Sequence, residues 1–204
     1  GNIKLDTPIL ASPMKDVCNS SIALEIRRLG GLGILHRFQP IEEQVLQYQQ
    51  SPIDTACAIG VKDDFKERFE KLYREGCTLF CIDTANGANI AVEKAIACLS
   101  KNGVKFIVGN VVSKECYKWV ASLPSVIAVR CGISGGKSCT TKDATGVYRG
   151  NISAIKECAE IKGNTLLIAD GGIRSASDVC KAIAYGADLV MFGSLIAACH
   201  DSPA

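Results

Sequence analysis

The stretch RCGISGGKSCTTKDATGVYRG, residues 130–150, contains residue types suited to nucleophilic chemistry. Cys139 lies in a glycine-rich segment, with Lys137 two residues before it and two threonines directly after it. A cysteine attacks as its thiolate, which a neighbouring cation such as Lys137 or Arg130 favours. The threonine hydroxyls are suited to position a water or an amine. The simpler interpretation is that Cys139 is a small loop residue without a catalytic role.

A second set of residues is suited to bind an anion. The segments ADGGIRSASD and FGS hold Gly171, Gly172 and Gly193, which lack side chains and let backbone N–H groups approach a phosphate. Ser194 would extend this wall, and Asp170 is placed to accept hydrogen bonds from ribose hydroxyls. Ordinary turns are the alternative interpretation.

Composition and charge narrow the class of protein. The chain has 204 residues and a net charge of +2, which gives no reason to expect nucleic acid or a membrane surface as a partner. No apolar run reaches the roughly 18 residues of a membrane span. The first residues, GNIKLDTP, lack a Met, so we expect a longer gene product.

The cysteines and histidines predict a reducing, intracellular protein without a metal site. The eleven cysteines are scattered, form no CxxC pair, and mostly lie in apolar segments, as buried hydrophobic residues would. His36 and His200 are the only histidines, and neither has ligand spacing with a cysteine pair.

Eight short apolar runs predict a parallel sheet, because each is nearly continuous, as in strands covered on both faces. Segments with helical spacing lie between them, among them 21–31, 62–76 and 175–187, each ending at glycine. Eight such units favour a single (β/α)8 TIM barrel over residues 1–204, with its last helix and C-terminal part truncated. A doubly wound open sheet is the structural alternative. The predicted strands are 8–12, 32–36, 56–60, 79–83, 105–110, 126–132, 166–172 and 189–194.

Polar residues recur where these strands end. In a TIM barrel the chemistry is performed at the C-terminal ends of the strands, so these side chains are expected to face one site. The residues are Ser12, His36, Asp83, Asn110, Arg130, Asp170, Gly193 and Ser194.

The motifs together resemble the inosine monophosphate dehydrogenase and guanosine monophosphate reductase family. They are ASPM, GILHRFQP, IGVKDDF, DTANG, GNVV, CGISGGKSCTTKDATGV and IADGGIRSASD…VMFGSLIA, in the family's order over nearly the whole chain. The resemblance implies a (β/α)8 barrel, a catalytic cysteine that attacks the purine C2, and a nicotinamide cofactor.

The resemblance also implies roles for individual residues. Cys139 and Thr141 would be catalytic, and Asp83, Ala85 and Asn86 would bind the cofactor. A purine nucleoside monophosphate would be held by Ser12, Met14, Asn110, Arg130, Gly132, Lys137, Asp170, Gly171, Gly172, Gly193 and Ser194. For Lys137 we favour a contact with the substrate phosphate over one with the Cys139 thiolate. A monovalent cation at the cysteine loop, a homotetramer and a cytoplasmic location are further expectations.

HRFQP, GVKDDF and Lys137 favour the GMP reductase branch with NADPH as cofactor, whereas IADGGIRSASD is shared with dehydrogenases, which use NAD. Lys15, Ser134 and the residues at 148–151 depart from the family pattern and bear on substrate choice. Two other interpretations stay open. One is a non-catalytic barrel that senses purine nucleotides, and the other is a sugar-phosphate isomerase, which would leave the cysteine loop unexplained.

Overall fold

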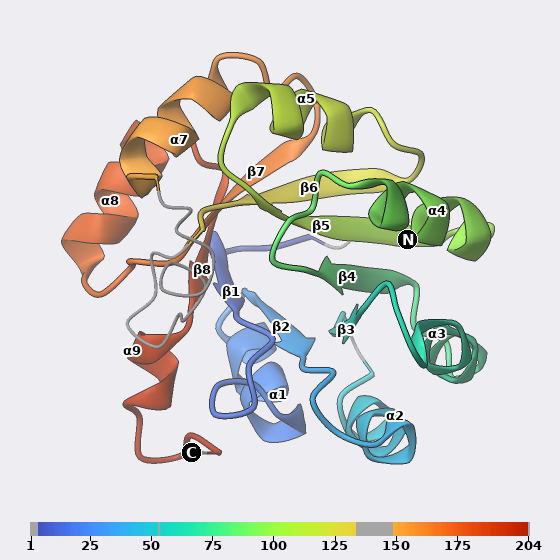
Figure 1. Cartoon of the computed structure of the whole chain (residues 1–204). Helices are drawn as coiled ribbons and strands as arrows, with labels where there is room; N and C mark the ends of the chain where they lie inside the picture. Colours follow the sequence, from blue (N-terminus) through green and yellow to red (C-terminus); the bar gives the residue numbers. More distant parts are fainter. Residues whose placement is uncertain (1–3, 53, 134–148, 204) are drawn as a thin grey trace.

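The computed structural model describes residues 4–52, 54–133 and 149–203, which form a closed barrel of eight parallel strands (Figure 1). Each strand pairs with the next along the chain, and β8 pairs with β1. This closure confirms the predicted TIM barrel and excludes the open sheet. The strands are β1 Ile9–Ala11, β2 Leu32–Leu35, β3 Ala56–Ile59, β4 Leu79–Asp83, β5 Lys105–Val111, β6 Val126–Cys131, β7 Leu166–Asp170 and β8 Leu189–Phe192.

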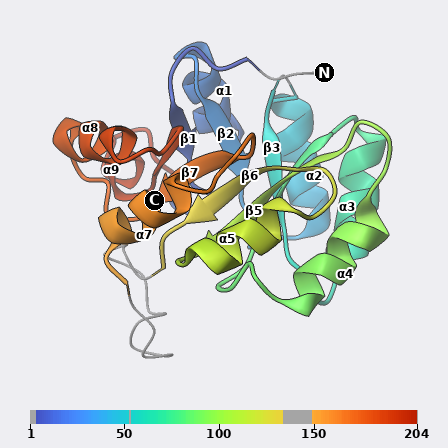
Figure 2. The ribbon, with the colours of Figure 1, turned by 90° about the horizontal axis from the view of Figure 1, so that it is seen from above.

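The helices lie around the outside of the barrel (Figure 2). They are α1 Ser20–Arg28, α2 Ile41–Gln50, α3 Phe65–Arg74, α4 Ile90–Leu99, α5 Lys114–Ala121, α7 Asn151–Ala159, α8 Ala176–Ala184 and the single turn α9 Ser194–Ala197. The three named helix predictions correspond to α1, α3 and α8. After each of them the chain turns at a glycine with positive φ, at Gly30, Gly76 and Gly186, as the C-cap pattern predicts.

Two of the predicted strands extend two residues beyond the observed ends. The run 166–172 stops being a strand at Asp170, because Gly171 and Gly172 have φ of 85° and 75°, which strand geometry does not allow. The run 189–194 ends at Phe192, because Gly193 and Ser194 belong to the start of α9. Both errors fall where the strand gives way to a candidate anion-binding turn.

Successive side chains along each strand point to opposite faces of the sheet, which creates two apolar layers. Side chains such as Leu10, Ile34 and Met191 form one buried cluster inside the barrel. Their neighbours along the strands, such as Leu35 and Ile82, belong to a larger cluster between the sheet and the helices. Both faces of each strand are therefore covered, which accounts for the continuous apolar runs in the sequence.

A buried polar network fixes α2 and α3 against the barrel. Arg68 of α3 is 4% exposed and donates from Nη1 to Oε1 of Gln44 at 2.8 Å. Gln44 of α2 in turn donates to the carbonyl of Ala58 on β3 at 2.9 Å. Because buried donors must be satisfied, this chain of bonds fixes α2 and α3 relative to β3.

The prediction that most cysteines are buried as small apolar residues is confirmed for the described residues. Among the described residues all cysteines are free thiols, and Cys18, Cys57, Cys77, Cys81, Cys131 and Cys158 are buried. Cys116 is half-buried, and Cys98, Cys180 and Cys199 are exposed. The described part of the chain contains no helix long and apolar enough to cross a membrane. It also contains no cluster of three His, Cys, Asp or Glu side chains able to hold a metal ion.

We predict that Gly33→Ala destabilises the barrel by about 1–3 kcal/mol, because the new methyl group would overpack the contact between β2 and α1. A Cβ at Gly33 would lie 2.6 Å from both Cα and Cβ of Ala23. Urea unfolding followed by circular dichroism measures the change. Gly60→Ala is the matched control, since the nearest atoms to its Cβ among the described residues would be those of the flexible Arg37 side chain, at 3.6 Å. Equal stability of the two variants would contradict this account of the packing.

Candidate active site

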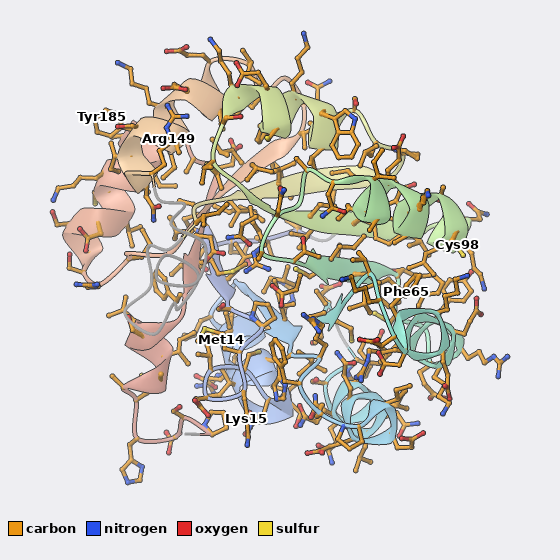
Figure 3. All side chains as sticks on the ribbon, viewed as in Figure 1. Met14, Lys15, Phe65, Cys98, Arg149 and Tyr185 are labelled. Atoms are coloured by element: carbon orange, nitrogen blue, oxygen red, sulfur yellow. The ribbon has the colours of Figure 1, made fainter. Side chains whose placement is uncertain are left out.

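A cavity of about 640 Å³ opens at the C-terminal ends of the strands. Its walls come from the segments that follow β1, β2, β4, β5, β6, β7 and β8. Met14, labelled in Figure 3, belongs to the wall that follows β1. The lining residues are Ser12, Pro13, Met14, Asp16, Val17, Arg37, Phe38, Asp83, Thr84, Ala85, Asn110, Arg130, Gly132, Ile133, Asp170, Gly171, Gly172, Ile173, Met191, Gly193, Ser194, Ala197 and Ala198.

Arg130, near the end of β6, forms the charged floor of the cavity. Its guanidinium is 2.7 Å from Oδ1 of Asp83 on β4 and 2.9 Å from Oδ2 of Asp170 on β7. The arginine reaches β4 across β5, where a Cβ at Gly109 would lie only 2.4 Å from the Arg130 Cβ. Burial disfavours the charge, but Asp170 and Asp83 more than compensate and raise the pKa of Arg130 well above its usual range.

Asn110 and Cys81 complete the surroundings of this ion-pair network. Asn110 donates from Nδ2 to Oδ2 of Asp170 and to the carbonyl of Gly132, both at 2.6 Å. The Cys81 sulfur lies 3.5 Å from Nη1 of Arg130. Burial raises the pKa of the Cys81 thiol to about 11, so it stays protonated near neutral pH.

The glycines after β6 and β7 leave space and free amides. A Cβ at Gly132 would lie 2.0 Å from the carbonyl oxygen of Asp170, so only glycine fits there. Gly171 and Gly172 have positive φ and line the cavity. Within the described residues the backbone amides of Gly171, Gly172 and Ile173 donate no hydrogen bond. Successive backbone amides of this kind can bind an anion.

The opposite wall, after β2 and β4, has a different character. Phe38 is 56% exposed, and the guanidinium carbon of Arg37 lies 4.6 Å from the centroid of its ring. Nε of Arg37 is 3.7 Å from Oδ2 of Asp83 and, in the part of the chain described here, is buried without a hydrogen-bond partner. This wall combines an aromatic face, a guanidinium and a carboxylate.

Most of the predicted site residues line the one cavity. They are Ser12, Met14, Asp83, Ala85, Asn110, Arg130, Gly132, Asp170, Gly171, Gly172, Gly193 and Ser194. Asn86 does not line it, because its Oδ1 accepts a hydrogen bond from the Ala88 amide within the turn before α4. Lys137, Cys139 and Thr141 lie outside the described residues, as does Ser134.

Four lining residues with polar or aromatic side chains were not predicted from the sequence: Asp16, Arg37, Phe38 and Thr84. For Arg37 and Phe38, which lie in the HRFQP motif, the position directly after β2 was the signal, since every strand end meets the same cavity. His36, which was considered as a strand-end residue, is buried outside the cavity lining, and its burial lowers its pKa.

Comparisons with known proteins converge on one family. Residues 1–204 match the family model described as IMP dehydrogenase / GMP reductase domain. An inosine-5'-monophosphate dehydrogenase of Cryptosporidium parvum is 30% identical, over 99% of this chain and 62% of its own length. A GMP reductase of Streptococcus gordonii is 32% identical, over 100% of this chain and 63% of its own length.

The fold agrees with these relatives. A crystal structure of inosine 5' monophosphate dehydrogenase from Legionella pneumophila matches with a TM-score of 0.88 and 29% identity, covering 95% of this chain and 59% of that one. The chain thus spans about three fifths of the length of the relatives that it matches.

We predict that Arg130→Met lowers the free energy of unfolding by about 3–5 kcal/mol at pH 7, because it leaves two partly buried carboxylates without their cation. Urea unfolding at pH 7 measures the difference from the unchanged protein. A deficit below about 1 kcal/mol would contradict the proposed role of the ion pairs.

Proposed function

The chain belongs to the IMP dehydrogenase / GMP reductase family, and from this membership we propose that it reduces GMP to IMP with NADPH. The observation that carries the proposal is the cavity in which most of the predicted nucleotide and cofactor residues meet around Arg130. Gly132 and Ile133 line this cavity, so the segment that carries Cys139 starts from its wall.

The purine nucleotide would occupy the side of the cavity formed by the segments after β6, β7, β8 and β1. Within the described residues the amides of Gly171, Gly172 and Ile173 have no acceptor, which suits them to its 5'-phosphate, and Gly193 and Ser194 line the same side. Asp170 is already fixed by Arg130 and Asn110, which orients its carboxylate for the ribose hydroxyls. Lys137 would add a cation to the phosphate site.

In the proposed reaction the Cys139 thiolate forms a bond to C2 of GMP. The bond between C2 and the exocyclic nitrogen breaks, and ammonia leaves with a proton delivered through Thr141. The purine is then held on Cys139 as a thioimidate. Once C2 has gained hydride, the sulfur–C2 bond breaks and IMP leaves with the thiolate restored. The sum is GMP, NADPH and two protons giving IMP, NADP and ammonium.

The residues after β2 and β4 fit a nicotinamide cofactor. Within the described residues Nε of Arg37 is a donor without a hydrogen-bond acceptor, and the exposed ring of Phe38 offers a flat apolar surface. Oδ2 of Asp83 lies 3.7 Å from this nitrogen, and a ribose hydroxyl would be a suitable donor to it. NADPH, when bound, supplies the hydride. The proposed cofactor residues are therefore Asp83 and Ala85, joined by Arg37 and Phe38.

IMP dehydrogenation with NAD is the second candidate. It is favoured by the match to the dehydrogenases of C. parvum and L. pneumophila. Both reactions would use Cys139, but the dehydrogenase would add water to the covalent intermediate instead of expelling ammonia. A monovalent cation at the cysteine loop, assembly into a homotetramer and a cytoplasmic location stay predictions from the sequence.

We predict that GMP supports measurable oxidation of NADPH, and that IMP supports slower or no reduction of NAD. Lys137 and the HRFQP motif, which favour the reductase, are the reason. The absorbance of the reduced nicotinamide follows both reactions. Rapid IMP oxidation without GMP reduction would assign the chain to the dehydrogenases. No turnover in either assay, with tight nucleotide binding, would favour a sensor.

We predict that Cys139→Ala abolishes turnover but changes nucleotide affinity by less than about tenfold, because the thiolate forms a bond in the reaction and adds little to ground-state binding. Steady-state kinetics and calorimetric titration measure the two effects. Cys57→Ala is the matched control: this thiol is fully buried on β3, so its loss should cost about 1 kcal/mol of stability and leave turnover intact. More than a few per cent of residual activity in Cys139→Ala would remove Cys139 from the mechanism.

A further inference from the structure

Asn151, the first residue of α7, holds two consecutive carbonyl groups of the turn after β7. Its Nδ2 donates to the carbonyl oxygen of Asp170 at 3.1 Å and to that of Gly171 at 2.7 Å. One side-chain amide therefore fixes two peptide units in a turn that lines the cavity, although Asn151 itself does not line it.

The planarity of the peptide bond determines what this contact does. In a trans peptide the C=O and the following N–H point in opposite directions. When Asn151 draws the carbonyls of Asp170 and Gly171 towards α7, the N–H groups of Gly171 and Gly172 point away from α7. Both glycines line the cavity, so these amides are turned to its interior. A turn free to rotate would present either dipole to an anion.

The oxygen of the Asn151 side-chain amide shows that this orientation of the side chain has an energetic cost. Oδ1 of Asn151 is buried and has no hydrogen-bond partner among the described residues. It lies beside Gly132, 3.4 Å from the position that a Cβ there would take. Leaving an acceptor unpaired is unfavourable, and reversing the amide would place the oxygen against two carbonyl oxygens. The donor role of Nδ2 therefore decides the orientation.

We propose that Asn151 is a positioning residue that orients the amides of Gly171 and Gly172 for the 5'-phosphate of the nucleotide. This rests on the proposed function, because it takes the anion to be a nucleoside monophosphate. Asn151 also begins the helix that follows the Cys139 segment in the chain. It therefore connects the start of α7 to the phosphate-binding turn.

The test compares the affinity of Asn151 variants for GMP with their affinity for guanosine, which lacks the phosphate. We expect Asn151→Ala to weaken GMP binding roughly tenfold and to change guanosine binding by less than about twofold. Asn151→Asp, which keeps the size but sets an oxygen against the two carbonyls, should weaken GMP binding further. Calorimetric titration gives the dissociation constants, and the aspartate variant serves if the alanine variant does not fold.

Asn19→Ala is the matched structural control. Asn19 caps α1 by accepting from the Ile22 amide at 3.0 Å, so its loss should lower the melting temperature and leave both affinities unchanged. If Asn151→Ala weakens GMP and guanosine equally, or weakens neither, the proposal is wrong.

An experiment with inorganic phosphate tests the role of Asn151 independently of the proposed function. It should raise the melting temperature of the unchanged protein and fail to raise that of the Asn151 variants. If the protein binds neither GMP nor IMP but shows this phosphate response, the nucleotide function is wrong and the role of Asn151 stands. If the unchanged protein responds to neither phosphate nor nucleotide, both proposals are wrong.

Discussion

The buried charge of Arg130 is the constraint on which the rest of the site depends. A guanidinium that is only 5% exposed must be neutralised and hydrogen-bonded within the protein. Asp83 and Asp170 meet that requirement from β4 and β7, and Asn110 fixes Asp170 from β5. Four strand ends are thereby tied to one cation. The walls of the cavity follow from this arrangement, because the loops continue from those ends.

Because Arg130 is engaged with two carboxylates, its charge is not free to neutralise a substrate phosphate. On the side of the described cavity formed after β7, anion binding must therefore come from neutral donors, such as the backbone amides that follow this strand. Neutral donors bind an anion well only when they are already oriented, since they attract it through dipoles and not through net charge. The contact between Asn151 and the carbonyls of Asp170 and Gly171 supplies that orientation.

The sequence was sufficient to predict the barrel, because strands buried on both faces leave an unmistakable apolar pattern. The same pattern predicted ends for β7 and β8 that lie too far along the chain. Gly171 and Gly193 are not polar, so they fit the apolar pattern, and they differ from strand residues only in backbone conformation. Arg37 and Asn151 were missed for another reason. Their partners, Asp83 and the Asp170 carbonyl, are distant in sequence, and only barrel closure brings them together.

The two candidate reactions make the same demands on the barrel. Each needs a purine 5'-monophosphate, a nicotinamide and a cysteine at C2, and they differ in whether ammonia leaves C2 or water attacks it. A rigid set of strand ends satisfies the shared demands, so the choice between the reactions belongs to groups close to C2. This explains why the chain is almost equally similar to a dehydrogenase, at 30% identity, and to a reductase, at 32%. Whole-chain identity is dominated by the barrel, and the barrel is what the two reactions have in common.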